Sequence, residues 1–200
     1  MSKKLARVLM IFVGLLVFAG PAAAQMDTWQ NDAAHSGVYF QIRYMKLNNI
    51  RGSFRKMNVT VQYDPKELSK SSIDATIDAA SIDTDLDPRD KDLRGPGYFD
   101  VEKYPTLTFK SKRLESAGMG KMKLTGDLTI HGVTKEAIFD VEGPTPVITD
   151  DKGNMFMGAT ATTVINRKDF GITANPAVSD EVLITLELDL KRATPAAAGN

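Results

Sequence analysis

Five aspartates are crowded into a stretch of ten residues. The stretch 83–92 contains Asp83, Asp85, Asp87, Asp90 and Asp92. Paired carboxylates can cleave glycosides, and clustered carboxylates can bind calcium. The stretch does not match an EF-hand loop, because the glycine and the final glutamate of that loop are missing. A solvated loop with salt bridges from these aspartates to Arg89, Lys91 and Arg94 accounts for the same residues, and we favour it.

The sequence contains two histidines, His35 and His131. Histidine can act as a base or as a metal ligand. Neither residue lies in a His-x-x-x-His or Glu-x-x-His pattern, so the metal signal is weak. We expect His35 to cap or hydrogen-bond at the start of the first strand, and His131 to lie in a turn.

The sequence lacks the residues that several other kinds of chemistry require. The chain has no cysteine, which excludes thiol redox work, thiolate nucleophiles and zinc–thiolate sites. It also has no Gly-x-Ser-x-Gly elbow, no phosphate-binding glycine loop and no dinucleotide fingerprint.

The first 24 residues have the layout of a secretory signal peptide. Three basic residues precede an apolar run from Val8 through Ala19, and the triplet Ala22-Ala23-Ala24 precedes Gln25. The run is shorter than the ~20 residues needed to span a bilayer. We therefore predict cleavage of residues 1–24, export to the periplasm and no stable membrane anchor. The mature chain would carry a net charge of −3, which gives no general attraction to nucleic acid.

Most of the remaining sequence alternates between apolar and polar residues. In the clearest segment, 182–190, every second residue from Val182 to Leu190 is apolar. A period of two indicates a strand with one buried face. About eight such strands predict an all-β barrel or sandwich. The other alternating segments are 38–43, 57–63, 73–79, 106–110, 124–130, 137–141 and 155–165.

The stretch 85–100 breaks this period and predicts one short helix over a barrel end. Asp87 is placed to cap the helix, with Pro88 at its first position. Its expected apolar anchors are Leu93, Tyr98 and Phe99. Turns and polar connections are expected at 64–72, 116–120, 131–132 and 151–154.

A barrel of about eight strands is either filled by side chains or holds one slender ligand. Small residues and flexible methionines at inward positions favour a cavity here. The small residues are Ala75, Ala79, Gly126, Ala137, Ala159 and Ala161, and the methionines are Met57, Met155 and Met157.

Ordered blocks of the sequence carry a resemblance to a known family. The blocks are Trp29–Asp32, Val38–Phe40, Ser81–Thr84 with Arg89-Asp90, Tyr98–Asp100, Tyr104-Pro105, Gly126–Thr134, and Asn166-Arg167 with Asp169–Ile172. The resemblance that they carry spans roughly Trp29 to Leu190, which is nearly the whole mature chain. They resemble the YceI family of lipocalin-like, polyisoprenoid-binding proteins.

The resemblance implies a single antiparallel, lipocalin-like barrel over residues 25–192, followed by a flexible tail over 193–200. It also implies an apolar interior that binds isoprenoid chains such as quinone-like or polyprenyl molecules. No catalytic residue can be carried over, so we predict a non-catalytic carrier without metal or cofactor. Tyr44 and Asp92 stand where many members have histidine, and Gly95 stands where serine is common. The two histidine losses put in doubt any metal, haem or polar head-group role of those two positions.

We expect inward apolar residues to line the ligand site. Arg94 is the candidate head-group contact at the barrel mouth, with a structural role as the favoured alternative. Arg89 with Asp90, and Arg167 with Asp169, are expected to form buried ion pairs that fasten loops. The predicted lining consists of Phe40, Ile42, Phe54, Met57, Val59, Leu93, Phe99, Leu107, Phe109, Leu128, Phe139, Met157, Phe170, Ile184 and Leu186.

Two other functions stay open at this point. One is a stress or interaction protein whose barrel is simply packed and holds no ligand. The other is a hydrolase that uses carboxylates of the 83–92 stretch. The sequence does not decide the oligomeric state, so a homodimer is also open.

Overall fold

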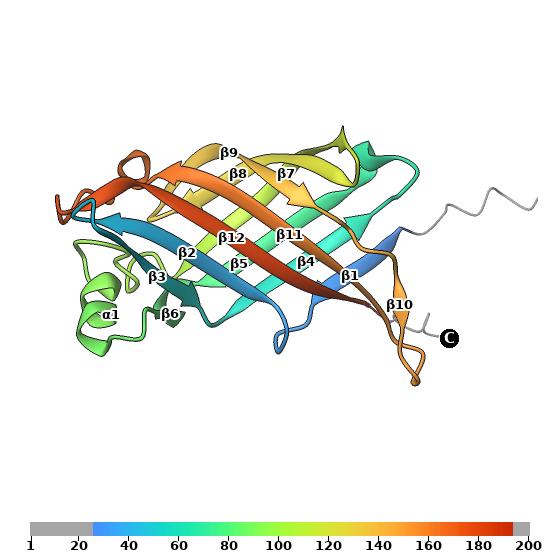
Figure 1. Ribbon diagram of the computed structural model, residues 1–200, viewed down its shortest axis with the longest axis horizontal. Coiled ribbons are helices and arrows are strands. Elements are labelled where there is room, and N and C mark those ends of the chain that lie inside the picture. Colours follow the sequence, from blue (N-terminus) through green and yellow to red (C-terminus); the bar gives the residue numbers. More distant parts are fainter. Residues whose placement is uncertain (1–25, 194–200) are drawn as a thin grey trace, which may run out of the picture.

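The computed structural model describes residues 26–193 as an elongated barrel with a short helix at one end (Figure 1). The predicted signal peptide and residues 194–200 of the predicted tail lie outside the described residues. Within residues 26–193, no helix is long and apolar enough to cross a membrane.

Eight antiparallel strands close into a barrel, which confirms the predicted all-β fold. Each strand pairs with the next, and the last strand, β12, pairs with both β11 and β1. In order around the barrel they are β1 (Asp27–Asn31), β4 (Met57–Tyr63), β5 (Ser72–Asp78), β7 (Thr106–Gly118), β8 (Lys121–Ile130), β9 (Val133–Glu142), β11 (Met155–Asn166) and β12 (Val178–Arg192).

Three further strands lengthen the barrel at one end. β2 (Gly37–Tyr44) follows β1 along the same edge of β12, β3 (Asn48–Phe54) leads into β4, and β6 (Ile82–Asp83) follows β5. β3 pairs with β2 and β6, and β6 ends the sheet on that side. The helix α1 (Asp87–Arg94) lies next to this free edge (Figure 1). We call this the mouth end, and the end with the β7–β8 turn the far end.

The remaining elements are short. β10 (Ile148–Thr149) pairs with β11 at the far end. Three 3-10 turns, η1 (Leu68–Lys70), η2 (Ala79–Ser81) and η3 (Arg167–Phe170), connect strands.

The predicted turns at 131–132 and 151–154 are confirmed. His131 and Gly132 have φ angles of 51° and 73° and join the paired residues Ile130 and Val133. Positive φ at both central residues is the requirement of a two-residue hairpin turn. At 151–154, the carboxylate of Asp150 accepts backbone N–H bonds from Lys152 and Asn154.

The predicted helix exists, but its start was misplaced by one residue. Leu86 is the N-cap, without a side-chain capping bond, and Asp87 is already helical. The carboxylate of Asp83 accepts the N–H of Asp85, whose φ is 59°. This local turn reverses the chain before Leu86, so Asp87 is not needed as the cap. Its charge still lies in the first turn, where the helix dipole favours an acid.

The polar connection predicted at 116–120 is mostly strand. β7 continues to Gly118, which pairs with Lys121 of β8. The register of this pair shifts between Ser111 and Arg113 and again between Ser116 and Gly118. Each bulge changes which face the following residues occupy, so the sequence loses its period although the strand continues.

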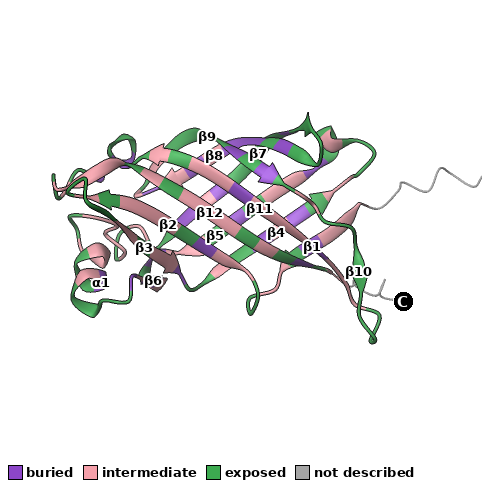
Figure 2. Cartoon of the chain, in the orientation of Figure 1, coloured by how far each residue is buried: buried purple, intermediate pink, exposed green. Residues whose placement is uncertain are grey.

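The inward residues of the alternation form one buried core (Figure 2). In the middle of the barrel, however, one of the small residues, Gly126, does not leave open space. A Cβ built on Gly126 would lie 2.5 Å from Cζ of Phe109. The Phe109 ring packs against Phe139 with a centroid distance of 5.1 Å. The expectation that small residues mark a cavity is therefore wrong at Gly126, where the missing side chain makes room for an aromatic ring.

We predict that Gly126→Ala lowers the free energy of unfolding by about 1–3 kcal/mol, because the new methyl group overpacks the core against Phe109. Gly158→Ala is the matched control, since its Cβ would meet no atom closer than 3.5 Å. Denaturant unfolding of both variants measures the difference. Equal stability of the two variants would contradict this account of the core.

Candidate ligand cavity

A cavity of about 500 Å³ occupies the mouth half of the barrel. Its walls are mainly aliphatic and aromatic side chains from β2, β3, β12 and α1, among them Phe40, Ile50, Leu93 and Val182. A smaller cavity of about 80 Å³ lies deeper, and Phe54, Leu107 and Ile184 line both. The two spaces therefore adjoin within one apolar interior.

The predicted lining residues divide between the two cavities. Phe40, Ile42, Phe54, Leu93, Phe99, Leu107, Phe170 and Ile184 line the larger one. Val59, Phe109, Leu128, Phe139 and Leu186 line the smaller one, together with residues shared by both. Met57 and Met157 line neither cavity; Met157 is buried and Met57 packs against the same core.

Polar groups gather at the mouth, and the lining prediction did not include them. Tyr44, Asn48, Arg89, Asp92 and Asn175 all line the larger cavity. They come from the β2–β3 turn, from α1 and from the loop after η3, which are far apart in the sequence. Tyr44 and Asp92 are two of the three positions at which the chain departs from the pattern of the YceI family. That departure was the sequence signal for Tyr44, and Asp92 was also one of the five crowded aspartates.

Thr84 connects two charged residues beside the cavity. Asp90 is buried and accepts hydrogen bonds from both the N–H and the hydroxyl of Thr84. Arg89 donates from Nε to Thr84 Oγ1 at 2.7 Å and from Nη2 to the Thr84 carbonyl at 2.7 Å. The expected Arg89–Asp90 ion pair is therefore replaced by two separate attachments to Thr84, because neighbouring helical side chains do not face each other.

Arg94 fastens the helix to the barrel instead of reaching the cavity. Its Nε donates to the carbonyl of Ala80 at 2.8 Å and its Nη2 to the carbonyl of Ile82 at 2.7 Å. It is not among the residues that line the larger cavity. The geometry thus favours the structural alternative for Arg94 over head-group contact.

Asp83 also has a different partner from the one expected. Its carboxylate accepts the Asp85 N–H and pairs with Arg55 at 2.8 Å. These bonds hold the pKa of Asp83 below its usual range, with the backbone bond as the largest cause and the Arg55 bond next. The salt bridges predicted from the aspartates to Arg89, Lys91 and Arg94 do not form in the described chain. Within the same part of the chain, no cluster of three acidic or histidine side chains is arranged to hold a metal.

Arg167 organises the loop on the other side of the mouth. Its side chain is 6% exposed. Nη1 donates to the carbonyls of Ile172 and Ala174 at 2.9 and 2.6 Å, and Nε donates to the Ser179 carbonyl at 2.9 Å. The nearby acid is Asp180 at 3.5 Å, so the predicted pair with Asp169 is wrong. A guanidinium with five donors suits this role, because the loop 172–179 turns its carbonyls inward.

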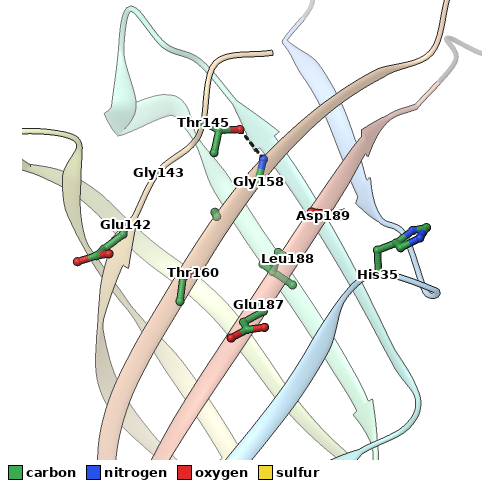
Figure 3. A pocket seen from close by; sticks show the side chains of 10 residues that line it. His35, Glu142, Gly143, Thr145, Gly158, Thr160, Glu187, Leu188 and Asp189 are labelled. Carbon is green, nitrogen blue, oxygen red and sulfur yellow. Dashed lines mark hydrogen bonds between the residues drawn. The ribbon is translucent and has the colours of Figure 1, made fainter. Parts of the chain in front are cut away.

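The two histidines stay outside the cavity. His131 lies in its predicted turn, where Nδ1 is 3.3 Å from the Phe170 carbonyl and the ring packs on Tyr104. His35 is exposed between β1 and β2, with Nδ1 3.2 Å from the Asp32 carboxylate. It borders a shallow depression of about 420 Å³ on the outside of the barrel (Figure 3).

That outer depression differs in character from the interior. It lies next to Glu142, the last residue of β9. After this strand the chain stays close to β11, because Oγ1 of Thr145 accepts the N–H of Gly158 at 2.9 Å (Figure 3). Glu187 and Asp189 add further carboxylates. An open, acidic surface gives little desolvation to an apolar ligand, so the interior cavity is the better candidate site.

We predict that Arg167→Met lowers the free energy of unfolding by about 2–4 kcal/mol, because the buried carbonyl of Ile172 and the partly buried carbonyl of Ala174 lose their donor. Lys168→Met is the control, since this neighbouring, exposed cation pairs with Asp180 on the surface and should contribute less than about 1 kcal/mol. Thermal and denaturant unfolding measure both variants. A loss for Arg167→Met as small as that of the control would refute the role of Arg167.

The chain matches known proteins along nearly its whole described length. The model of the YceI-like domain family matches residues 29–190. A UPF0312 protein of Vibrio cholerae serotype O1 is 34% identical over 180 residues, which cover 90% of this chain and 93% of the relative. The crystal structure of BcnA from Burkholderia cenocepacia superposes with a TM-score of 0.71 at 28% identity, covering 82% of this chain and 99% of BcnA.

A more distant structure shares the fold. It is a polyisoprenoid-binding domain from Saccharophagus degradans, with a TM-score of 0.61 and 15% identity, covering 84% of this chain and 99% of that domain. The family model and the UPF0312 relative each match most of the chain, and the chain belongs to the YceI-like domain family.

Proposed function

We propose that this protein binds an isoprenoid-type lipid, polyprenyl or quinone-like, inside the barrel and carries or sequesters it without chemical change. The observation that carries the proposal is the cavity of about 500 Å³, walled by apolar side chains and open at the end near α1. This volume lies within the range of about 300–1,000 Å³ found for small-molecule sites. The Saccharophagus degradans domain of the same fold is described as polyisoprenoid-binding.

Desolvation supplies the driving force in this proposal. Each Å² of apolar surface moved from water into the cavity contributes about 25 cal/mol. An unbranched or methyl-branched chain can follow the cavity from the mouth toward Phe54 and Ile184, which also line the deeper space. The interior offers few hydrogen-bonding groups there, so affinity for the tail comes from burial and shape.

Arg89 is the better candidate for the head group. It lines the cavity, while its Nε and Nη2 are held by Thr84. The guanidinium is therefore fixed in place, and its remaining Nη1 donors stay available for a carbonyl or phosphate oxygen. Arg94 has both Nε and Nη2 committed to backbone carbonyls behind the helix.

The geometry gives less support to the two alternatives. A fully packed barrel does not agree with a cavity of this size in the mouth half. For the hydrolase, the carboxylates of the 83–92 stretch have mainly structural partners: Asp83 binds Arg55, and Asp90 is buried against Thr84. Asp92 does line the cavity, but one carboxylate is not the pair that glycoside cleavage requires.

We predict that Ile184→Trp reduces lipid loading at least about tenfold, because the indole fills the space shared by both cavities. Leu183→Trp is the matched control: it is the adjacent residue on the outer face, and 37% of its surface is exposed. The measurement is mass spectrometry of an organic extract of each purified protein, followed by uptake of added geranylgeraniol or ubiquinone. Circular dichroism checks that both variants are folded.

Three further variants distinguish a lipid carrier from the alternative functions. Arg89→Gln should weaken loading of a quinone or polyprenyl phosphate more than that of a plain hydrocarbon chain. Asp83→Asn and Asp90→Asn should retain the lipid loading of the unmutated protein, as expected of a carrier that does not use these carboxylates for chemistry. An empty extract together with no uptake of either added lipid by the unmutated protein would overturn the proposed function.

We further propose that the protein is exported to the periplasm after cleavage between Ala24 and Gln25, on the strength of the signal-peptide layout of residues 1–24. The intact mass of the exported protein should then match residues 25–200. Replacing Ala22 and Ala24 by Lys should block processing, since small residues are needed before the cleavage site. An unprocessed protein retained in the cytoplasm would contradict the export proposal and leave the ligand proposal standing.

A further inference from the structure

A turn at the cavity mouth exposes two large apolar side chains. The β2–β3 turn joins Tyr44 to Asn48, both of which line the larger cavity. Between them, Met45 is 56% and Leu47 is 74% exposed. The turn lies at the same end of the barrel as α1 (Figure 1). Any ligand that enters the cavity at Tyr44 therefore passes close to these two side chains.

The backbone conformation of the turn accounts for the exposure of Met45 and Leu47. Met45 and Lys46 have φ angles of 48° and 60°, a region that residues other than glycine seldom adopt. The N–H of Leu47 donates to the Tyr44 carbonyl at 2.9 Å, and the N–H of Met45 donates to the Ala177 carbonyl at 2.7 Å. The turn is thus held in shape by hydrogen bonds on both sides, and it presents Met45 and Leu47 to solvent.

The same hairpin carries unbalanced positive charge. Residues 43–51 contain Arg43, Lys46 and Arg51 and no acidic residue. Arg43 bonds to the side-chain amide of Asn49, and Arg51 to that of Gln41. None of the three cations takes part in a salt bridge within residues 26–193. Their charge is therefore available to an anionic partner.

The far end provides a contrast. It also exposes apolar residues, since Met119 is 99% and Ile148 is 66% exposed. The segment 142–151 around Ile148, however, contains three acidic residues and no basic one. Lys121, next to the Met119 turn, pairs with Glu142. The far end thus places acidic residues beside its exposed apolar side chains, whereas the mouth end carries acidic residues on α1 and at the start of β12 but none on the β2–β3 turn.

We propose that the turn 44–48 docks on the surface of an anionic lipid bilayer. Met45 and Leu47 enter the region between head groups and acyl chains, and Arg43, Lys46 and Arg51 face the lipid phosphates. Docking places the cavity mouth against the bilayer, so that an apolar ligand moves between membrane and barrel without crossing water. The transfer step rests on the proposed function, whereas docking itself does not.

A bilayer fits this surface better than a protein partner does. A stable protein interface buries about 800 Å² on each partner, and two side chains on a narrow turn offer only a small part of that area. Interfacial membrane binding, in contrast, works with a few inserted apolar residues and nearby cations. The ligand proposed for the cavity is itself a membrane component, which gives the mouth a reason to lie at a bilayer.

The test is co-sedimentation of the mature protein, residues 25–200, with vesicles of phosphatidylethanolamine and phosphatidylglycerol. Met45→Ser with Leu47→Ser should weaken binding at least about tenfold, because the inserted apolar surface is lost. Met119→Ser with Ile148→Ser is the matched control at the far end and should bind as the unmutated protein does. Lys46→Gln should weaken binding about fivefold, and added salt should weaken it further.

Loading of geranylgeraniol from vesicle-free solution is measured in parallel. The Met45→Ser, Leu47→Ser variant should load normally there and fail only in transfer from vesicles. If the protein loads no lipid yet docks through this turn, the proposed function fails and the docking proposal stands. If the unmutated protein does not sediment with the anionic vesicles, or if the mouth and far-end variants bind equally, the docking proposal is overturned.

Discussion

The structure depends on the hydrogen-bonded edges of β12. One edge pairs with β11 over eleven consecutive positions, from Phe156 opposite Lys191 to Asn166 opposite Glu181. The other edge is shared, with β1 on its C-terminal part and β2 on its N-terminal part. This shared edge closes the sheet into a barrel, which removes the exposed edges that an open sheet of this length would present. It also decides where the sheet can open, since β2, β3 and β6 have no strand beyond β6 to complete the circle.

The cavity follows from this topology more than from the size of the inward side chains. In the middle of the barrel the wall is closed on all sides, and the ring of Phe109 fills the space opposite Gly126. Toward the mouth, the sheet ends at β6, and α1 lies beside this free edge with Leu93 as a partly buried contact to the core. A short helix covers an opening less completely than a paired strand does, and the larger cavity lies there.

Local patterns in the sequence were sufficient to predict eight of the strands, but they missed β1, β3, β6 and β10 and did not predict how the sheet closes. The alternation from Val182 to Leu190 predicts a strand with one buried face, and the two-residue turn at His131-Gly132 follows from a glycine at a positive φ. The length of β7 could not be predicted, because its bulges interrupt the alternation after Ser111. Pairing of β12 with β1 and β2 joins residues more than 130 positions apart, and no local pattern carries that information.

Side-chain partners were mispredicted where backbone groups compete with acids. Arg167 was expected to bind Asp169, its neighbour in sequence, but the carbonyls of loop 172–179 surround its guanidinium. Arg94 and Arg89 likewise bind backbone oxygens in preference to the nearby aspartates. Closeness in the sequence identifies candidate ion pairs. The backbone carbonyls that compete with the acids for an arginine are known only once the conformation of the loop is known.

These arginines have a common consequence for binding. Arg94 ties α1 to the segment after β5, and Arg167 fixes the loop that leads into β12, so both sides of the mouth are held by partly buried hydrogen bonds before any ligand arrives. A preformed mouth loses little conformational entropy on binding, and more of the burial energy then appears as affinity. The hydrogen bonds also restrict how far the opening can widen. In the proposed function, selection of a slender chain over a bulky apolar molecule would follow from the same contacts that stabilise the loops.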